Sequence, residues 1–83
     1  MNTQVISDQA INPGLIDTSR KQPTPREIEA LQYIANGFDS KTTAKKMRIS
    51  KRTVDFHLAN VYTKLDASNR VQAINNARAK GYL

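Results

Sequence analysis

The sequence predicts an all-α domain of four short helices that follows a short irregular segment. Helix-capping residues recur along positions 23–83, and the apolar residues between them repeat every three or four positions. At 83 residues the chain is long enough for one small domain. Residues 1–22 have no sustained periodicity and contain the turn signal Asn12-Pro13-Gly14, so they predict a flexible arm or a segment that becomes ordered on a partner.

The first predicted helix begins at a capping box. In the sequence TPRE (24–27), the hydroxyl of Thr24 and the carboxylate of Glu27 can each accept the other residue's backbone amide proton. Gly37 ends the helix, with Phe38 packing just beyond it. The apolar residues at helical spacing are Ile28, Leu31, Ile34 and Ala35.

Residues 40–59 predict two further helices around a tight turn, which is the spacing of a helix-turn-helix. Asp39 or Ser40 would cap a helix that ends near Met47, and Ser50 would cap the next. The small residue where the two helices approach is Ala44, and their shared core comprises Met47, Ile49 and Val54.

The helix expected at 51–65 has one apolar face, formed by Val54, Leu58, Val61 and Leu65. With ~100° per residue, a helical wheel directs other residues away from that face. His57 lies beside the apolar face, where it is expected to be half-buried rather than catalytic. The residues predicted to point outward are Arg52, Phe56, Ala59, Asn60 and Thr63, flanked by Lys51 and Asp55.

The last helix is expected at 69–80, after a break marked by Asp66 and Ser68. Gly81 ends it, and the two residues beyond can fold back over the core. Its expected apolar face comprises Val71, Ile74 and Ala77, with Tyr82 and Leu83 folding back.

Charge is concentrated on the predicted helix-turn-helix. The net charge is +6 and the sequence pI about 10.0, which favours an anionic polymer as partner. Within 41–64 a single acid, Asp55, stands against seven cations. These cations are Lys41, Lys45, Lys46, Arg48, Lys51, Arg52 and Lys64.

Several function classes have no support in the sequence. The chain has no cysteine, and its one histidine has no acidic cluster nearby, so no metal site or cofactor is expected. Neither a G-x-S-x-G motif nor a glycine-rich phosphate loop is present, which argues against an enzyme. No secretory or membrane-spanning segment and no small-molecule site is evident, so a cytoplasmic, nucleoid-associated protein is expected.

The outward face of the 51–65 helix suits base recognition in the major groove of duplex DNA. Arg52 could pair with guanine and Asn60 with adenine, while Asp55 could accept from the amino group of cytosine. Phe56 could contact a thymine methyl group, and Ala59 lies among these candidates. Some of these residues also have a purely structural alternative. Arg52 could simply be solvated at the surface, and Phe56 could pack over its own helix. Asp55 could interact favourably with the helix dipole.

Taken together, these motifs resemble the DNA-binding domain of LuxR-type transcriptional regulators, also called the GerE-like or NarL-like helix-turn-helix. The resemblance covers 24–83 and is closest in wording to the quorum-sensing branch of the family. The sequences that carry it are TPRE (24–27), ISKRTVDFHL (49–58), SNRVQAI (68–74) and KGYL (80–83).

The resemblance implies that the 51–65 helix enters the major groove and that the 69–80 helix forms a homodimer on inverted-repeat sites. With the basic residues noted above, it gives phosphate-contact candidates at Lys41, Lys45, Lys46, Lys51, Thr53, Thr63 and Lys64. The dimer-interface candidates are Gln72, Asn75, Asn76 and Ala79.

The chain departs from the family pattern at several positions. Thr42 and Thr43 replace the usual glutamate and branched apolar residue, and Pro23 stands where many members have leucine. Asp55 and Ala59 stand where many members carry cations, so the preferred DNA sequence is expected to differ from a family consensus. No ligand-binding or phosphoacceptor domain accompanies the helices, so the chain is expected to be a stand-alone regulator or a fragment of a longer protein.

The leading hypothesis is a dimeric, sequence-specific transcription regulator that binds double-stranded DNA, with RNA polymerase or a larger regulator as a further possible partner. A second hypothesis is an anti-activator, a protein-interaction module that forms a heterodimer with a larger LuxR-type regulator through residues 69–80.

Overall fold

The computed structural model describes residues 22–83, which form four α-helices and no strand. The helices are α1 (Pro25–Ala35), α2 (Ser40–Met47), α3 (Lys51–Lys64) and α4 (Arg70–Ala79). Each lies within one residue of its predicted position, so the all-α fold class is confirmed. The predicted arm lies outside the described residues, except for Gln22.

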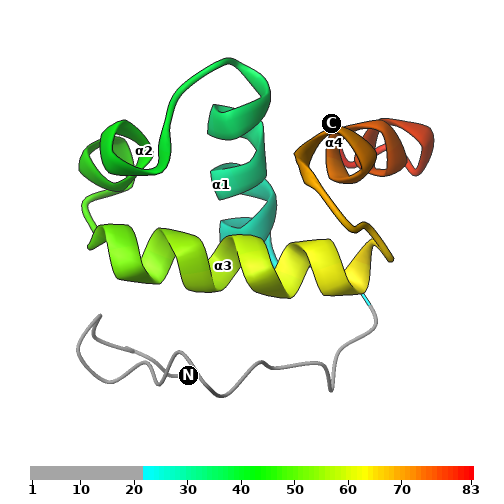
Figure 1. The fold of residues 1–83 in the computed structure, drawn as a ribbon, viewed down its shortest axis with the longest axis horizontal. Coiled ribbons are helices and arrows are strands. Elements are labelled where there is room, and N and C mark those ends of the chain that lie inside the picture. The colour runs from blue at the N-terminus through cyan, green and yellow to red at the C-terminus, as the bar shows by residue number, and fades with distance from the viewer. Residues whose placement is uncertain (1–21) are drawn as a thin grey trace.

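The longest helix, α3, is the element on which the other three are arranged (Figure 1). α2 lies at its N-terminal end, α1 crosses its middle, and α4 lies at its C-terminal end. All three pack from the same side, so the opposite side of α3 is not covered by any other helix of the described residues.

Each helix begins at a polar residue that caps its first turn. In every case the cap side chain accepts the backbone amide proton of the residue three positions later, which satisfies a donor that the helix leaves free. For Asp39 this hydrogen bond, 2.7 Å from the Thr42 amide, lowers the pKa of the carboxyl. The four caps are Thr24, Asp39, Ser50 and Asn69, and the Thr24–Glu27 capping box is complete.

Each helix ends in the same way, with a residue in the left-handed region just after its last turn. The amide of the following residue then bonds a carbonyl five positions back, at 2.8–3.1 Å, which is the Schellman motif. Gly37 and Gly81 adopt this conformation without a Cβ penalty, whereas Arg48 and Asp66 adopt it at a cost of roughly 1–2 kcal/mol each. The turn between α2 and α3 is therefore held in a strained conformation by its flanking helices.

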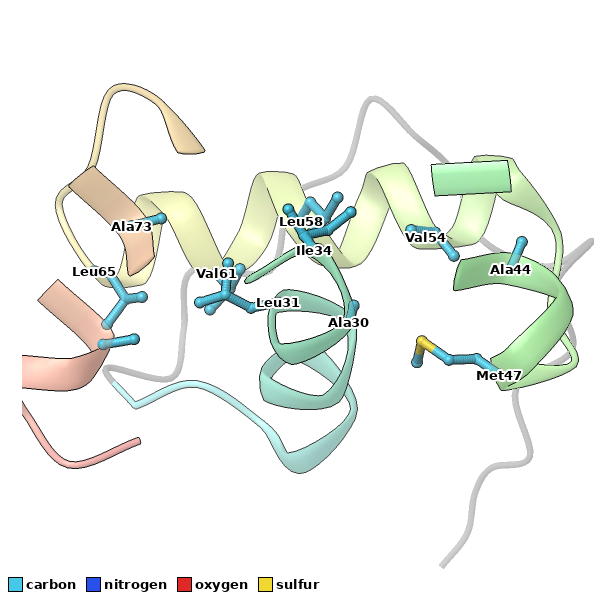
Figure 2. Close-up of a cluster of buried hydrophobic side chains, with 11 residues drawn as sticks. Ala30, Leu31, Ile34, Ala44, Met47, Val54, Leu58, Val61, Leu65 and Ala73 are labelled. Atoms are coloured by element: carbon cyan, nitrogen blue, oxygen red, sulfur yellow. The ribbon is translucent and has the colours of Figure 1, made fainter. Parts of the chain in front are cut away.

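The core is a continuous band along the inner side of α3 (Figure 2). Near the start of α3, Val54 lies opposite Ala44 and Met47 of α2, and further along Leu31 of α1 lies against Val61. The band ends at the junction with α4. Its buried members are Ala30, Leu31, Ile34, Ala44, Met47, Val54, Leu58, Val61, Leu65, Ala73 and Ala77.

The apolar face predicted for α4 is partly wrong. Ala77 is buried and Ile74 packs partly against the core, but Val71 is 65% exposed and Ala73 takes the inner position instead. Val71 lies roughly 200° around the helix from Ala73, so both cannot face α3. The buried contact of α4 with the core is therefore made mainly by Ala73 and Ala77, and Val71 stays on the surface.

Buried polar groups separate into satisfied and unsatisfied ones. Thr53 is buried, and its hydroxyl oxygen accepts a hydrogen bond from the Ser50 hydroxyl at 3.0 Å. Thr43 is fully buried on α2, and its hydroxyl has no hydrogen-bond partner within the described residues. The family resemblance noted above implies a branched apolar residue at position 43, and Thr43 instead places a polar atom in an apolar seam.

Replacing Thr43 by valine should stabilise the fold. Valine keeps the shape of threonine and removes the unpaired hydroxyl, so the free energy of unfolding should rise by about 1 kcal/mol in urea denaturation.

The matched control is Thr53→Val, the same substitution at a buried threonine whose hydroxyl is hydrogen-bonded. That variant should lose about 1 kcal/mol. Equal changes at both sites would contradict the assignment of Thr43 as an unsatisfied group.

Candidate nucleic-acid interface

The uncovered side of α3 presents most of the residues predicted to recognise bases. Arg52 and Asp55 are exposed, while Phe56 and Ala59 are half-buried. Together with Lys51 these residues line a shallow, open depression on the protein surface. The structure thus places four of the five predicted base-recognition residues in one concave patch, the groove-facing patch.

Two charges of this patch form an ion pair. The Lys51 ammonium nitrogen lies 2.8 Å from Asp55 Oδ2, one helical turn away, and the two side chains are 62% and 49% exposed. An exposed pair of this kind contributes little to stability. The pair places an acid and a base side by side on the surface.

The groove-facing patch shares Lys51 and Arg52 with a larger set of exposed cations, the basic surface. Six cations of α2, the turn and the start of α3 are exposed, and one of them, Lys46, lies 4.8 Å from the centre of the Phe38 ring. The Phe38 ring in turn meets Tyr33 edge to face, 5.9 Å between centroids. The six residues of the basic surface are Lys41, Lys45, Lys46, Arg48, Lys51 and Arg52.

The predicted outward position of Asn60 is wrong. Asn60 is 2% exposed, and its Oδ1 has no hydrogen-bond partner within the described residues. The helical wheel assumed one buried stripe, whereas α1, α2 and α4 bury α3 over a wider arc. Asn60 therefore cannot reach a base edge from the position that it occupies here.

Two predicted phosphate contacts are also corrected. The Lys64 side chain is 2% exposed and its ammonium lies 3.1 and 3.2 Å from the two Glu27 carboxylate oxygens, so it pairs inside the protein. Thr53 is buried with its hydroxyl bonded to Ser50. Thr63 is exposed, although its hydroxyl donates to the Ala59 carbonyl at 3.0 Å. The half-buried position predicted for His57 is confirmed.

The dimer candidates lie on the outer side of α4, with one exception. Gln72, Asn75 and Ala79 are exposed. Asn76 is half-buried, and its amide donates to the Leu65 carbonyl at 2.9 Å, so it ties the end of α3 to α4 instead of offering a free surface. Exposed Val71 shares this outer side and was not among the predicted interface residues.

Sequence reasoning missed three residues that position the patch. Glu27 was assigned only to the capping box, although it also pairs with Lys64. Arg26 donates to the Met47 carbonyl at 3.1 Å and holds the end of α2. Arg48 was noted only for its charge, yet it supplies the left-handed turn. The tight turn predicted between the two helices was the available signal for Arg48, and no local pattern reveals the other two contacts.

Neither a metal centre nor a membrane-spanning helix is found among residues 22–83. Residues 22–83 contain no group of three histidine, cysteine or acidic residues close enough to hold a metal ion. None of the four described helices combines the length and the apolar character that crossing a membrane requires.

Two short helices around a tight turn, with the second exposed beside a basic surface, define a helix-turn-helix domain. A sequence model of the luxR family of bacterial regulatory proteins (GerE) matches residues 22–77. The chain belongs to this family, which confirms the resemblance drawn from its motifs.

Three relatives of this chain are longer proteins. The transcriptional activator protein SolR of Ralstonia solanacearum is 41% identical over 71 residues, covering 86% of this chain and 30% of SolR. The transcriptional regulatory proteins ComA and YdfI of Bacillus subtilis are 30% and 40% identical, covering 96% and 75% of this chain and 38% and 29% of their own lengths. The chain thus spans about a third of the length of these relatives. No solved structure matched it.

The buried ion pair generates a stability prediction. Lys64→Met should lower the free energy of unfolding by about 3 kcal/mol in chemical denaturation, because the Glu27 carboxylate would stay buried without its cation. Adding Glu27→Gln should recover part of this loss, since glutamine can still complete the capping box.

The control is Lys51→Met, which breaks an exposed pair and should change stability by less than about 1 kcal/mol. Similar losses in Lys64→Met and Lys51→Met would show that the Glu27–Lys64 pair has no special role.

Proposed function

We propose that this chain is a non-enzymatic, sequence-specific transcription regulator that binds double-stranded DNA in the cytoplasm as a homodimer, with α3 in the major groove. The observation that carries the proposal is the groove-facing patch: a side of α3 left uncovered by the other helices, concave, and bordered by the basic surface. Membership of the luxR family and the regulatory functions named for its relatives support the same assignment.

The basic surface would supply affinity for DNA of any sequence. Its six exposed cations extend from α2 across the turn to the first residues of α3. When such groups neutralise phosphates they release condensed counterions, so binding should weaken steeply with salt. These contacts would also set the register of α3 in the groove without discriminating between sequences.

The groove-facing patch would supply the preference for sequence. Arg52 has five donors that can pair with the two acceptors of guanine, and half-buried Phe56 offers an apolar surface to a thymine methyl group. Ala59 leaves room for a base edge to approach α3. We assign no base contact to Asn60, because its side chain is buried.

The outer side of α4 would pair two copies of the chain. Exposed Val71 lies on this side with Gln72, Asn75 and Ala79, and an apolar residue on a polar helix face is a natural centre for a contact. The same surface would serve a heterodimer with a larger regulator, as the anti-activator hypothesis requires, so DNA binding decides between the two functions.

Replacing Arg52 by alanine should weaken binding to duplex DNA. If the guanidinium contacts a phosphate, the salt dependence of the association constant should fall by about one unit of slope, and if it pairs with guanine, discrimination at one base pair should drop by about 1–3 kcal/mol. Titrations at several salt concentrations would measure both effects.

Lys80→Ala is the control, because it removes the same charge from an exposed residue beyond α4. Arg52→Ala protein with unchanged affinity and unchanged salt slope would exclude α3 from the contact surface.

Replacing Ala79 by lysine should disrupt the proposed homodimer. A long charged side chain would meet its own copy across a symmetric contact, so sedimentation should show a monomer and affinity for an inverted-repeat duplex should fall despite the added positive charge. Gln32→Lys, at an exposed position of α1, is the matched control and should leave both unchanged. A dimeric Ala79→Lys protein with undiminished affinity would refute the α4 interface.

A further inference from the structure

The acid in the groove-facing patch requires an explanation of its own. Asp55 is the only carboxylate among the five residues that line the depression, and it lies next to the basic surface. A negative charge at a surface that meets phosphates opposes binding. If α3 enters the major groove, as the proposed function states and as this inference requires, Asp55 meets the base edges, where only a hydrogen-bond donor can pair with it.

The ion pair leaves half of the Asp55 carboxylate available. Lys51 contacts Oδ2 at 2.8 Å, and the Asp55 side chain is 49% exposed, which leaves Oδ1 accessible to a donor on the DNA. An ionised carboxylate can only accept hydrogen bonds, so a base that meets Oδ1 must offer a donor. Lys51 has three donors and uses one of them on Asp55.

Base edges in the major groove differ sharply in what they offer to an acceptor. Guanine and thymine present only acceptors there, whereas cytosine and adenine present an amino group. Adenine also places its N7 acceptor beside the amino group, so the second carboxylate oxygen would face a repelling atom. Cytosine has no acceptor on that edge and is the best match for Asp55.

We propose that the Lys51–Asp55 pair is a specificity determinant that selects cytosine at one position of each half-site. Asp55 Oδ1 accepts the cytosine amino group, and the same carboxylate repels guanine and thymine at that position. Lys51 orients the carboxylate through Oδ2 and offsets its repulsion of the phosphates. The pair therefore lowers affinity for non-cognate DNA and raises the ratio of cognate to non-cognate binding.

The test is a selection of duplexes from a pool with a randomised window, performed with the full chain and with Asp55→Ala. The unaltered chain should enrich cytosine at one position per half-site, and the variant should lose that preference alone. In titrations, changing this cytosine to thymine should reduce binding of the unaltered chain about tenfold and leave the variant unaffected. Affinity of the variant for a mixed-sequence duplex should rise, since Lys51 is freed for a phosphate.

Glu29→Gln is the matched control, because Glu29 forms a similar exposed pair with Arg26, at 2.9 Å, on α1. It should change neither base preference nor affinity. Asp55→Asn, which keeps the shape of the side chain and removes its charge, guards against an effect of folding in the alanine variant and should also lose the repulsion of thymine and guanine.

The outcomes separate this inference from the proposed function. If the unaltered chain enriches a sequence and Asp55→Ala enriches the same one with cytosine retained, the inference is overturned while the proposed function stands. A uniform gain of affinity with unchanged base preference overturns it as well, because Asp55 is then only a repelling charge. Adenine in place of cytosine overturns the assignment of the base. Failure of the unaltered chain to enrich any duplex overturns the proposed function itself.

Discussion

The buried pair between Glu27 and Lys64 sets the geometry of this domain. The two residues lie 37 positions apart, in the first turn of α1 and the last turn of α3, and their side chains are 4% and 2% exposed. The Glu27 carboxylate also accepts the Thr24 amide at 2.9 Å, so the group that starts α1 anchors it on α3. A desolvated charge must keep its partner, and this requirement fixes how α1 crosses α3. The crossing determines which flank of α3 is inside, where Asn60 lies, and which side remains open.

Local interactions define the ends of the helices, and tertiary contacts arrange them. Each helix has its own N-cap and its own left-handed ending, and short connections join them. At the turn before α3, left-handed Arg48 follows Met47, whose carbonyl accepts from Arg26 of α1. The strained turn is therefore tied to the first turn of α1, which places the basic surface beside the groove-facing patch. A single region of α1 thus positions both ends of α3.

The sequence predicts well what depends on neighbouring residues and poorly what depends on distant ones. The Thr24 capping box, the Gly37 ending and the Ser50 cap are local patterns, and all are confirmed. The burial of Asn60 and Lys64 depends on where α1 crosses α3, which no local pattern encodes. Val71 was placed on the inner face of the last helix with Ile74 and Ala77, whereas the close approach of α4 to α3 required alanine at position 73. Arg52 and Asp55 agree with the helical wheel, since both are exposed and line the open depression on α3.

The small size of the residues that α4 buries affects the stability of this helix in solution. Only Ala73 and Ala77 of this helix are fully buried, and α4 packs chiefly against the end of α3. Alanine side chains remove little apolar area from water, so the burial of these two residues contributes little to holding α4 against α3. A second chain that covers Val71 would bind only the attached form, and mass action would then couple the melting temperature to protein concentration. In the homodimer proposed above, dilution alone would therefore loosen α4.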